Sequence, residues 1–210
     1  MSTARRYSSE VRAEQRRATR QRVLEAARAL LLRRGYTGTT VDAIAHRAGV
    51  SVQTVYNTVG GKAAVLKAVY DTALAGDDEP VPIMERPTVA AMREATDARR
   101  FLALYARLGR EMYARVGALL PILLEPAARD FADTIEGERL KGTAMIAAIL
   151  DERFTLRPGL SAADAADVLW TLTAPELQVR LVHRRGWSLQ RYEAWLATTM
   201  ANALLPGAPT

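Results

Sequence analysis

Several residue types that build reactive or metal-binding sites are absent or scarce in this sequence. There is no cysteine, which excludes disulfide bonds, thiolate nucleophiles and zinc sites made by cysteine. The only histidines are His46 and His183, and neither lies near a nucleophile in the sequence, so we expect no enzyme activity, no catalytic residue, no metal and no cofactor. No uncharged apolar run reaches the ~20 residues that a membrane-spanning helix needs. The sequence therefore predicts a cytoplasmic protein that does not enter a membrane.

Alternating β-branched stretches of strand length are also missing, whereas alanine, leucine, arginine and glutamate are abundant. This composition predicts an all-α fold. Helix-breaking residues cluster from Gly76 to Pro82 and as far as Pro87, which predicts a boundary between a domain at 1–75 and a second domain at 76–210. In the second domain, the apolar spacing predicts helices at about 97–116, 118–155, 161–183 and 188–204.

Positive charge is concentrated at one end of the chain. Residues 1–70 hold 13 Lys and Arg against 4 Asp and Glu, a net charge of +9, whereas residues 71–210 hold 16 against 19 and carry −3. The basic third predicts an anionic partner for the N-terminal domain alone, and nucleic acid fits best. On charge alone, a solvated basic helix explains the pattern equally well.

The N-terminal domain contains the pattern of a helix-turn-helix motif at about residues 40–59. The first short helix begins at Thr39 or Thr40, either of which can act as an N-cap residue. Gly49 supplies the positive φ that the tight turn needs, and Ser51 is the expected N-cap residue of the second short helix. A linking helix at 62–75 follows.

Small and branched apolar residues fill the space between these two helices, which leaves one face of the second helix polar. A helix N-terminus also attracts phosphate groups. The pattern therefore predicts a helix that reads DNA, although an ordinary helical hairpin with a polar outer face shares part of it. The residues left on that face are Gln53, Thr54, Tyr56, Asn57 and Thr58.

Residues 19–70 closely resemble the tetracycline-repressor (TetR) family of bacterial transcriptional regulators. The resemblance is carried by the helix-turn-helix pattern, Ala26-Ala27, the Gly35-Tyr36-Thr37 turn and the closing Lys62. It implies a homodimer that places two reading helices in successive major grooves of a palindromic operator in double-stranded DNA. It also implies a C-terminal domain that binds a small-molecule effector, and hence a repressor that the effector releases from DNA.

The resemblance also implies roles for individual residues at matched positions. Thr40 and Lys62 resemble residues that contact phosphate at helix starts, Thr39 lies beside them in the same candidate interface, and Tyr56 resembles the family's phosphate-binding tyrosine. The positions from which family members read bases are Val52, Gln53, Thr54, Asn57 and Thr58. The amide of Gln53 can pair bidentately with adenine, and Val52 can contact a thymine methyl group.

Alternatives remain for the N-terminal arm and for the whole chain. The arginine-rich arm at 1–18 could contact DNA phosphates or reach a minor groove, and a solvated helical lead-in explains its charges equally well. The competing functions are a DNA-architectural protein without small-molecule control and a small-molecule carrier whose basic head is incidental.

The second domain gives weaker signals. Polar or soft bulky side chains on otherwise aliphatic helix faces are candidates for contact with an effector, although such residues more often belong to the core. They are Tyr105, Met112, Trp170 and Thr173. Pro175 predicts a kink that frees the carbonyl of Thr171. The last helix is apolar on more than one face, which together with the family resemblance predicts dimerisation through the helices at about 161–183 and 188–204.

Overall fold

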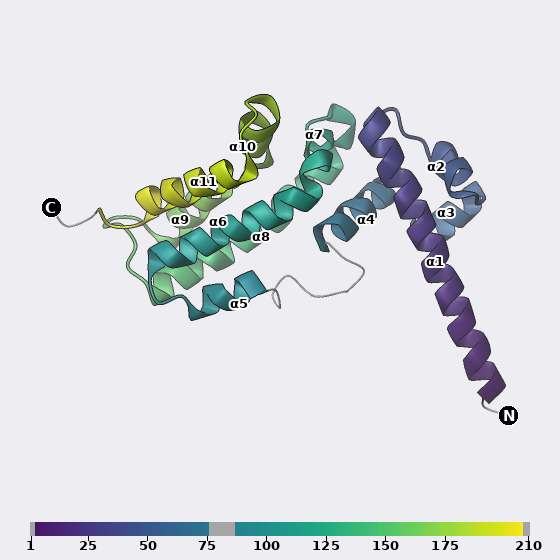
Figure 1. Ribbon diagram of the computed structural model, residues 1–210, viewed down its shortest axis with the longest axis horizontal. Helices are drawn as coiled ribbons and strands as arrows, with labels where there is room; N and C mark the ends of the chain where they lie inside the picture. The colour runs from purple at the N-terminus through teal and green to yellow at the C-terminus, as the bar shows by residue number, and fades with distance from the viewer. Residues whose placement is uncertain (1–2, 76–86, 208–210) are drawn as a thin grey trace. The chain divides into compact units, whose positions relative to one another are not determined.

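The computed structural model describes residues 3–75 and 87–207. The regular elements in these ranges are all helices, which confirms the predicted all-α class (Figure 1). The chain divides into two compact units, one made of Met1–Ala73 and Pro121–Phe131, the other of Leu74–Leu120 and Ala132–Thr210. The predicted boundary at residues 76–86 lies outside the described residues.

The N-terminal unit is built on α1 (Thr3–Arg34), α2 (Val41–Ala48), α3 (Val52–Thr58) and α4 (Lys62–Ala75). Helices α2 and α3 both pack against α1, and α3 follows α2 after a short turn. The core between these helices consists of small and branched apolar side chains, as the sequence predicted. It includes Val23, Ala27, Leu30, Leu31, Ile44, Ala45, Val55, Val65, Leu66 and Val69.

The turn between α2 and α3 has the geometry predicted for a helix-turn-helix motif. Gly49 adopts a left-handed backbone with φ 67° and ψ 39°. Ser51 caps α3, because its Oγ accepts a hydrogen bond of 3.1 Å from the backbone N–H of Thr54.

The start of α2 resolves the choice between two adjacent threonines. Thr40 is the N-cap residue, since its Oγ1 accepts a hydrogen bond of 3.1 Å from the backbone N–H of Ala43. The alternative, Thr39, is wrong. Its hydroxyl donates instead to the carbonyl of Gly35 at 2.7 Å, and its side chain is only 1% exposed.

The segment after α6 (Ala98–Val116) contradicts the single helix predicted at 118–155. The residue before a proline is disfavoured in the helical region, and Glu125 is accordingly extended, with φ −77° and ψ 130°, before Pro126. The chain therefore forms the 3₁₀ helix η2 (Gly117–Leu119), α7 (Leu120–Leu123), the 3₁₀ helix η3 (Pro126–Ala128) and then α8 (Arg129–Arg153).

The C-terminal unit is built around α6 and α11 (Leu189–Leu204). Helix α11 packs along α6 and α9 (Ala162–Leu172), and α5 (Pro87–Glu94), which the sequence analysis did not anticipate, packs along α6 (Figure 1). The core of this unit includes Phe101, Leu102, Leu104, Leu150, Leu169, Tyr192, Leu196 and Met200.

The helix predicted at 161–183 is interrupted. Its start is correct, because Ser161 and Asp164 form a capping box, but α9 ends at Leu172. Ala174 is extended, with φ −61° and ψ 135°, before Pro175. The chain continues as α10 (Pro175–Gln178) and the π-helix η4 (Val179–Arg184).

The carbonyl of Thr171 was predicted to be free, and this was wrong. It accepts a hydrogen bond of 3.2 Å from the backbone N–H of Ala174. The break at Pro175 thus closes into a turn. Across the described ranges, none of the helices has both the length and the apolar character that crossing a bilayer requires.

Candidate nucleic-acid interface

Helix α3 presents a polar face to the surface of the N-terminal unit. Val55 is fully buried and anchors the helix on the core, whereas Tyr56 is 51% exposed and Val52 is 36% exposed. Gln53 and Asn57 are exposed as well. The side chains expected to approach DNA therefore lie on the side of α3 opposite its anchor.

Gln53 and Asn57 are joined on this face. The Nε2 amide of Gln53 donates a hydrogen bond of 2.9 Å to Asn57 Oδ1, one helical turn away. This bond leaves the carbonyl oxygen of Gln53 and the amide group of Asn57 directed to solvent. An acceptor and a donor are thus held side by side, which is the combination that the edge of an adenine requires.

Thr54 and Thr58 are less available than their neighbours. Both are half-buried. The hydroxyl of Thr54 shares a hydrogen bond of 2.8 Å with Ser51 Oγ, and Thr58 Oγ1 donates to the backbone carbonyl of Thr54 at 2.6 Å. These hydroxyls therefore form hydrogen bonds within α3 and its cap, whereas the amides of Gln53 and Asn57 remain exposed.

The expected phosphate contacts do not all lie on the surface. Thr40 is exposed at the start of α2, and Lys62 is half-buried at the start of α4. The Lys62 ammonium lies 4.2 Å from the centre of the Tyr36 ring, a cation–π contact that restricts its position. Thr39 is buried with its hydroxyl on Gly35, so its side chain does not fit the expected role.

A carboxylate from a distant part of the sequence holds the turn between α1 and α2. Glu125 accepts hydrogen bonds from Tyr36 N–H at 2.9 Å, Thr37 N–H at 3.0 Å and Thr37 Oγ1 at 3.1 Å. Partial desolvation raises the pKa of the Glu125 carboxyl, but these hydrogen bonds and the charge of Lys62 outweigh it and bring the pKa below its ordinary value. Glu125 is therefore ionised at neutral pH.

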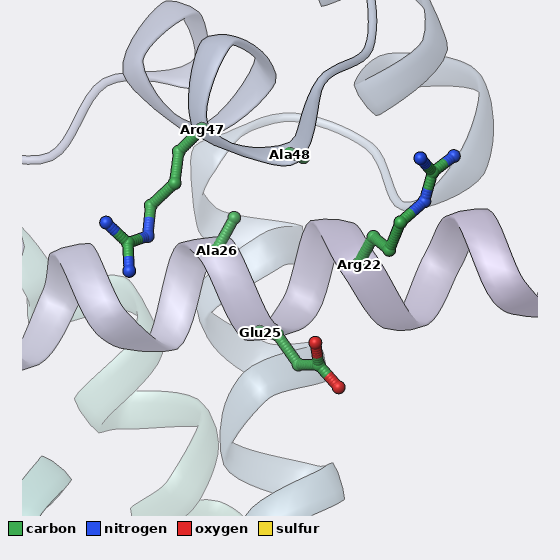
Figure 2. Close-up of a pocket in the computed structure, with 5 residues that line it drawn as sticks. All are labelled: Arg22, Glu25, Ala26, Arg47 and Ala48. Carbon is green, nitrogen blue, oxygen red and sulfur yellow. The ribbon is translucent and has the colours of Figure 1, made fainter.

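Two arginines flank a hollow of about 380 Å³ between α1 and α2. Arg22 and Arg47 lie on opposite sides of Ala26 and are both exposed (Figure 2). Within the described residues, neither is held by a hydrogen bond or an ion pair. The hollow therefore carries two guanidinium groups without an ion pair, together with the carboxylate of Glu25, on the same unit as α3.

The arginine-rich arm is helical from Thr3 onward and is continuous with α1. Its described side chains from residue 14 to residue 18 are exposed. Arg20, close to the arm, donates a hydrogen bond of 3.4 Å to the carbonyl of Thr58 at the end of α3. One arginine of α1 thus contacts the expected reading helix.

Residues 23–69 match the family model described as bacterial regulatory proteins, tetR family. The match covers all of α2 and α3, the C-terminal part of α1 and the first part of α4. The N-terminal domain belongs to the tetR family of bacterial regulatory proteins. A curated relative, described as the uncharacterized HTH-type transcriptional regulator YdeS of Bacillus subtilis strain 168, is 37% identical over 100 residues. That alignment covers 48% of this chain and 49% of YdeS, so the chain matches about half the length of this relative.

Solved structures share the fold of most of this chain at low sequence identity. NalD, described as the secondary repressor of the MexAB-OprM multidrug efflux pump in Pseudomonas aeruginosa, is 19% identical with a TM-score of 0.69, over 91% of this chain and 98% of NalD. The SmeT–triclosan complex is 20% identical with a TM-score of 0.63, over 90% and 92% of the two chains. The fatty acid degradation regulator FadR of Bacillus halodurans is 17% identical with a TM-score of 0.66, over 86% and 93%.

In the C-terminal unit, three of the four effector candidates gather around Arg139. The guanidinium of Arg139 donates to the carbonyl of Trp170 at 2.5 Å and to Thr173 Oγ1 at 3.3 Å, and it lies 5.7 Å from the Trp170 ring centre. Desolvation inside the unit raises the pKa of Tyr105 to about 12, partly offset by Arg139 and by a hydrogen bond with Thr173. The fourth candidate, Met112, is partly buried against the core.

Glu125 and Arg139 were not predicted from the sequence. Both are single charged residues in amphipathic or loop sequence, and nothing local distinguishes them from solvated charges. Glu125 acts on Tyr36 and Thr37 across 88 or more positions of sequence, so only the tertiary fold reveals it.

Proposed function

We propose that this protein is a DNA-binding transcriptional repressor that uses α3 to read a palindromic operator. A small molecule that binds the protein would release it from the DNA. The observation that carries the proposal is the exposed amide pair of Gln53 and Asn57, fixed on a helix whose opposite side is anchored by the buried Val55. This arrangement supplies directional hydrogen bonds to base edges at a place where a major groove admits a helix.

Phosphate contacts would set the orientation of α3 on the duplex. We assign Thr40, Tyr56 and Lys62 to this role, because Thr40 and Lys62 lie at helix starts and Tyr56 is exposed on α3. Thr39 is left out because it is buried. The free guanidinium groups of Arg22 and Arg47 extend the positive surface toward α1. Such contacts raise affinity for every DNA sequence without selecting one.

We assign reading and phosphate contact to residues 1–75 together with 121–131, and effector binding and dimerisation to the remainder. Gln53 is the principal base reader and Asn57 its partner, with Val52 available to a thymine methyl group. Thr54 and Thr58 support α3, since their hydroxyls already bond within it.

The effector would bind near the polar cluster of Tyr105, Arg139, Trp170 and Thr173. The Arg139 guanidinium pairs with the Glu136 carboxylate at 2.6 and 2.7 Å, so the cluster is a charged network within a mainly apolar unit. A few polar groups on an apolar lining are what orient a small molecule in a pocket. The repressor role is supported by the description of NalD, and ligand binding by the triclosan complex of SmeT, both of which share this fold.

We propose a homodimer formed through the α9–η4 region and α11. Helix α11 leaves Ala194 and Thr198 exposed next to the half-buried Trp195, so small side chains and an aromatic anchor share one surface. A two-fold dimer would place two copies of α3 about one turn of DNA apart, ~34–36 Å. This separation is the quantity that an effector can change.

The experiment that tests the function is selection of DNA from a randomised duplex pool by the wild-type chain, followed by footprinting on the recovered duplex. Recovery of a short palindrome with a discrete footprint supports the repressor. Diffuse protection without a common sequence would support a DNA-architectural protein, and failure to retain any duplex would support a small-molecule carrier.

Release is tested with triclosan as the first probe, because SmeT is solved with it. We expect a probe that binds the C-terminal unit to lower operator affinity, and Thr173→Val to weaken that effect. Thr171→Val, at an exposed position two residues away, is the matched control. Equal responses of both variants would remove Thr173 from the effector site.

A further inference from the structure

The carboxylate of Glu125 fills a site made by backbone N–H groups. Gly35 ends α1 with φ 68°, and this left-handed residue turns the following N–H groups of Tyr36 and Thr37 toward one point. Successive N–H groups after a helical-to-left-handed step form a concave site for an anion. A side chain of the protein itself occupies that site.

A side chain at position 35 would displace the Glu125 carboxylate from this site. A Cβ atom on Gly35 would lie 2.6 Å from Glu125 Oε1 and 3.3 Å from its carboxyl carbon. Two separate features of the sequence, a glycine at the end of α1 and a glutamate far along the chain, are therefore matched in space.

The turn that Glu125 holds leads directly to the expected phosphate contacts. The backbone N–H of Thr39 donates to the carbonyl of Tyr36 at 3.1 Å, and the next residue, Thr40, begins α2. On the other side, the ring of Tyr36 carries the Lys62 ammonium. Glu125 thus connects to Lys62 through Tyr36, and to Thr40 through Tyr36 and Thr39.

A second contact attaches the same segment to α4. The ring of Phe131 meets the ring of Tyr70 edge to face, with centroids 5.5 Å apart and planes at 75°. Residues 121–131 are therefore held at two points of the N-terminal unit. In the sequence, residues from the other unit precede and follow them.

We propose that Glu125 is a positioning residue for DNA binding: it fixes the α1–α2 turn, and with it Thr40 and Lys62, in the arrangement that contacts phosphate. The inference rests on the proposed function. The segment 121–131 is then the part of the chain through which residues beyond the helix-turn-helix motif set its affinity for DNA.

The test compares Glu125→Gln with wild type on the duplex that wild type recovers from a randomised pool and on a random duplex, over a salt series. A glutamine accepts from one N–H but presents its own N–H₂ to the other, so the turn loses its fixed position. We expect affinity to fall about tenfold on both duplexes, as for a lost charge-assisted hydrogen bond. The salt dependence should become flatter, because one phosphate contact is impaired.

The matched control is Glu152→Gln, which removes the same charge from an exposed position of α8. A second comparison repeats Glu125→Gln in a Lys62→Ala background, where the loss should be smaller because Lys62 no longer contributes. If Glu125 did not act through Lys62, the two losses would be additive, and that result would overturn the proposal.

A milder variant covers the case in which Glu125→Gln does not fold. Thr37→Val removes only the hydroxyl bond to Glu125 and should weaken binding in the same direction by a smaller factor. If Glu125→Gln and Thr37→Val both fold and bind as tightly as Glu152→Gln, the inference fails alone. If wild type recovers no preferred duplex, the proposed function itself fails.

Discussion

Gln53 and Asn57 hydrogen-bond to each other across one turn of α3. Each side chain restricts the rotamers of the other before any DNA is present, so less side-chain entropy remains to be lost on binding. The pairing also fixes which amide atoms point outward. A helix with these two residues is therefore prepared for one type of base edge.

The first prediction concerns specificity. Gln53→Ala should cost ~1–3 kcal/mol on the selected duplex and relax preference at one base position, because it removes a directional contact and the partner of Asn57. Competition fluorescence anisotropy on single-base variants of that duplex measures both effects. Equal losses on selected and random DNA would show that Gln53 does not read a base.

The second prediction concerns Lys62. Lys62→Ala should weaken binding to all sequences alike and reduce the slope of log affinity against log salt by about 1, as expected for one phosphate contact. A salt titration on selected and random duplexes gives both quantities. Lys67→Ala, which removes a lysine paired with Asp71 on the same helix, is the control, and an identical effect of that variant would contradict a specific role for Lys62.

The third prediction concerns the arm. Deleting residues 1–15 should lower affinity for DNA and flatten its salt dependence, because the segment carries three arginines against two glutamates. Since α1 is continuous from Thr3 to Arg34, circular dichroism should show a loss of helix without a change in the remaining fold. If the deletion variant binds DNA as tightly as wild type at every salt concentration, the arm does not contact DNA.

The fourth prediction concerns the end of α1. Gly35→Ala should destabilise the chain by at least ~1–2 kcal/mol, the cost of a left-handed backbone for a residue with a Cβ atom, and the collision with Glu125 should add to it. Urea unfolding measures the loss. In a Glu125→Ala background, the destabilisation caused by the collision should disappear, and the cost of the left-handed backbone should remain. If Gly35→Ala lowers the free energy of unfolding equally in both backgrounds, the close approach to Glu125 does not affect stability.

The sequence specified the helix-turn-helix motif well because its determinants are local. Gly49 and Ser51 each act on backbone within a few residues, and the burial of Val55 follows from helical spacing. The choice between Thr39 and Thr40 could not be made, because adjacent threonines have the same capping chemistry and only the fold shows which hydroxyl is buried.

Two long helices were predicted where the chain breaks, and in both a proline decides the outcome. Apolar residues continue at helical spacing past Pro126 and Pro175, so periodicity favoured a continuous helix. The extended residues that precede these prolines, Glu125 and Ala174, interrupt it. The role of Glu125 depends on this interruption and on a partner far away in the sequence, so local pattern could not reveal it.

Gly35 and Gly49 have nearly the same φ, 68° and 67°, yet the two positions should differ in which substitutions they tolerate. A Cβ atom at position 49 would meet nothing within 4 Å, so asparagine, which enters the left-handed region readily, is an accessible replacement there. At position 35 any larger residue would have to displace the Glu125 carboxylate from the turn. Among descendants of this chain, asparagine should therefore arise at 49 independently, whereas position 35 should change only together with position 125.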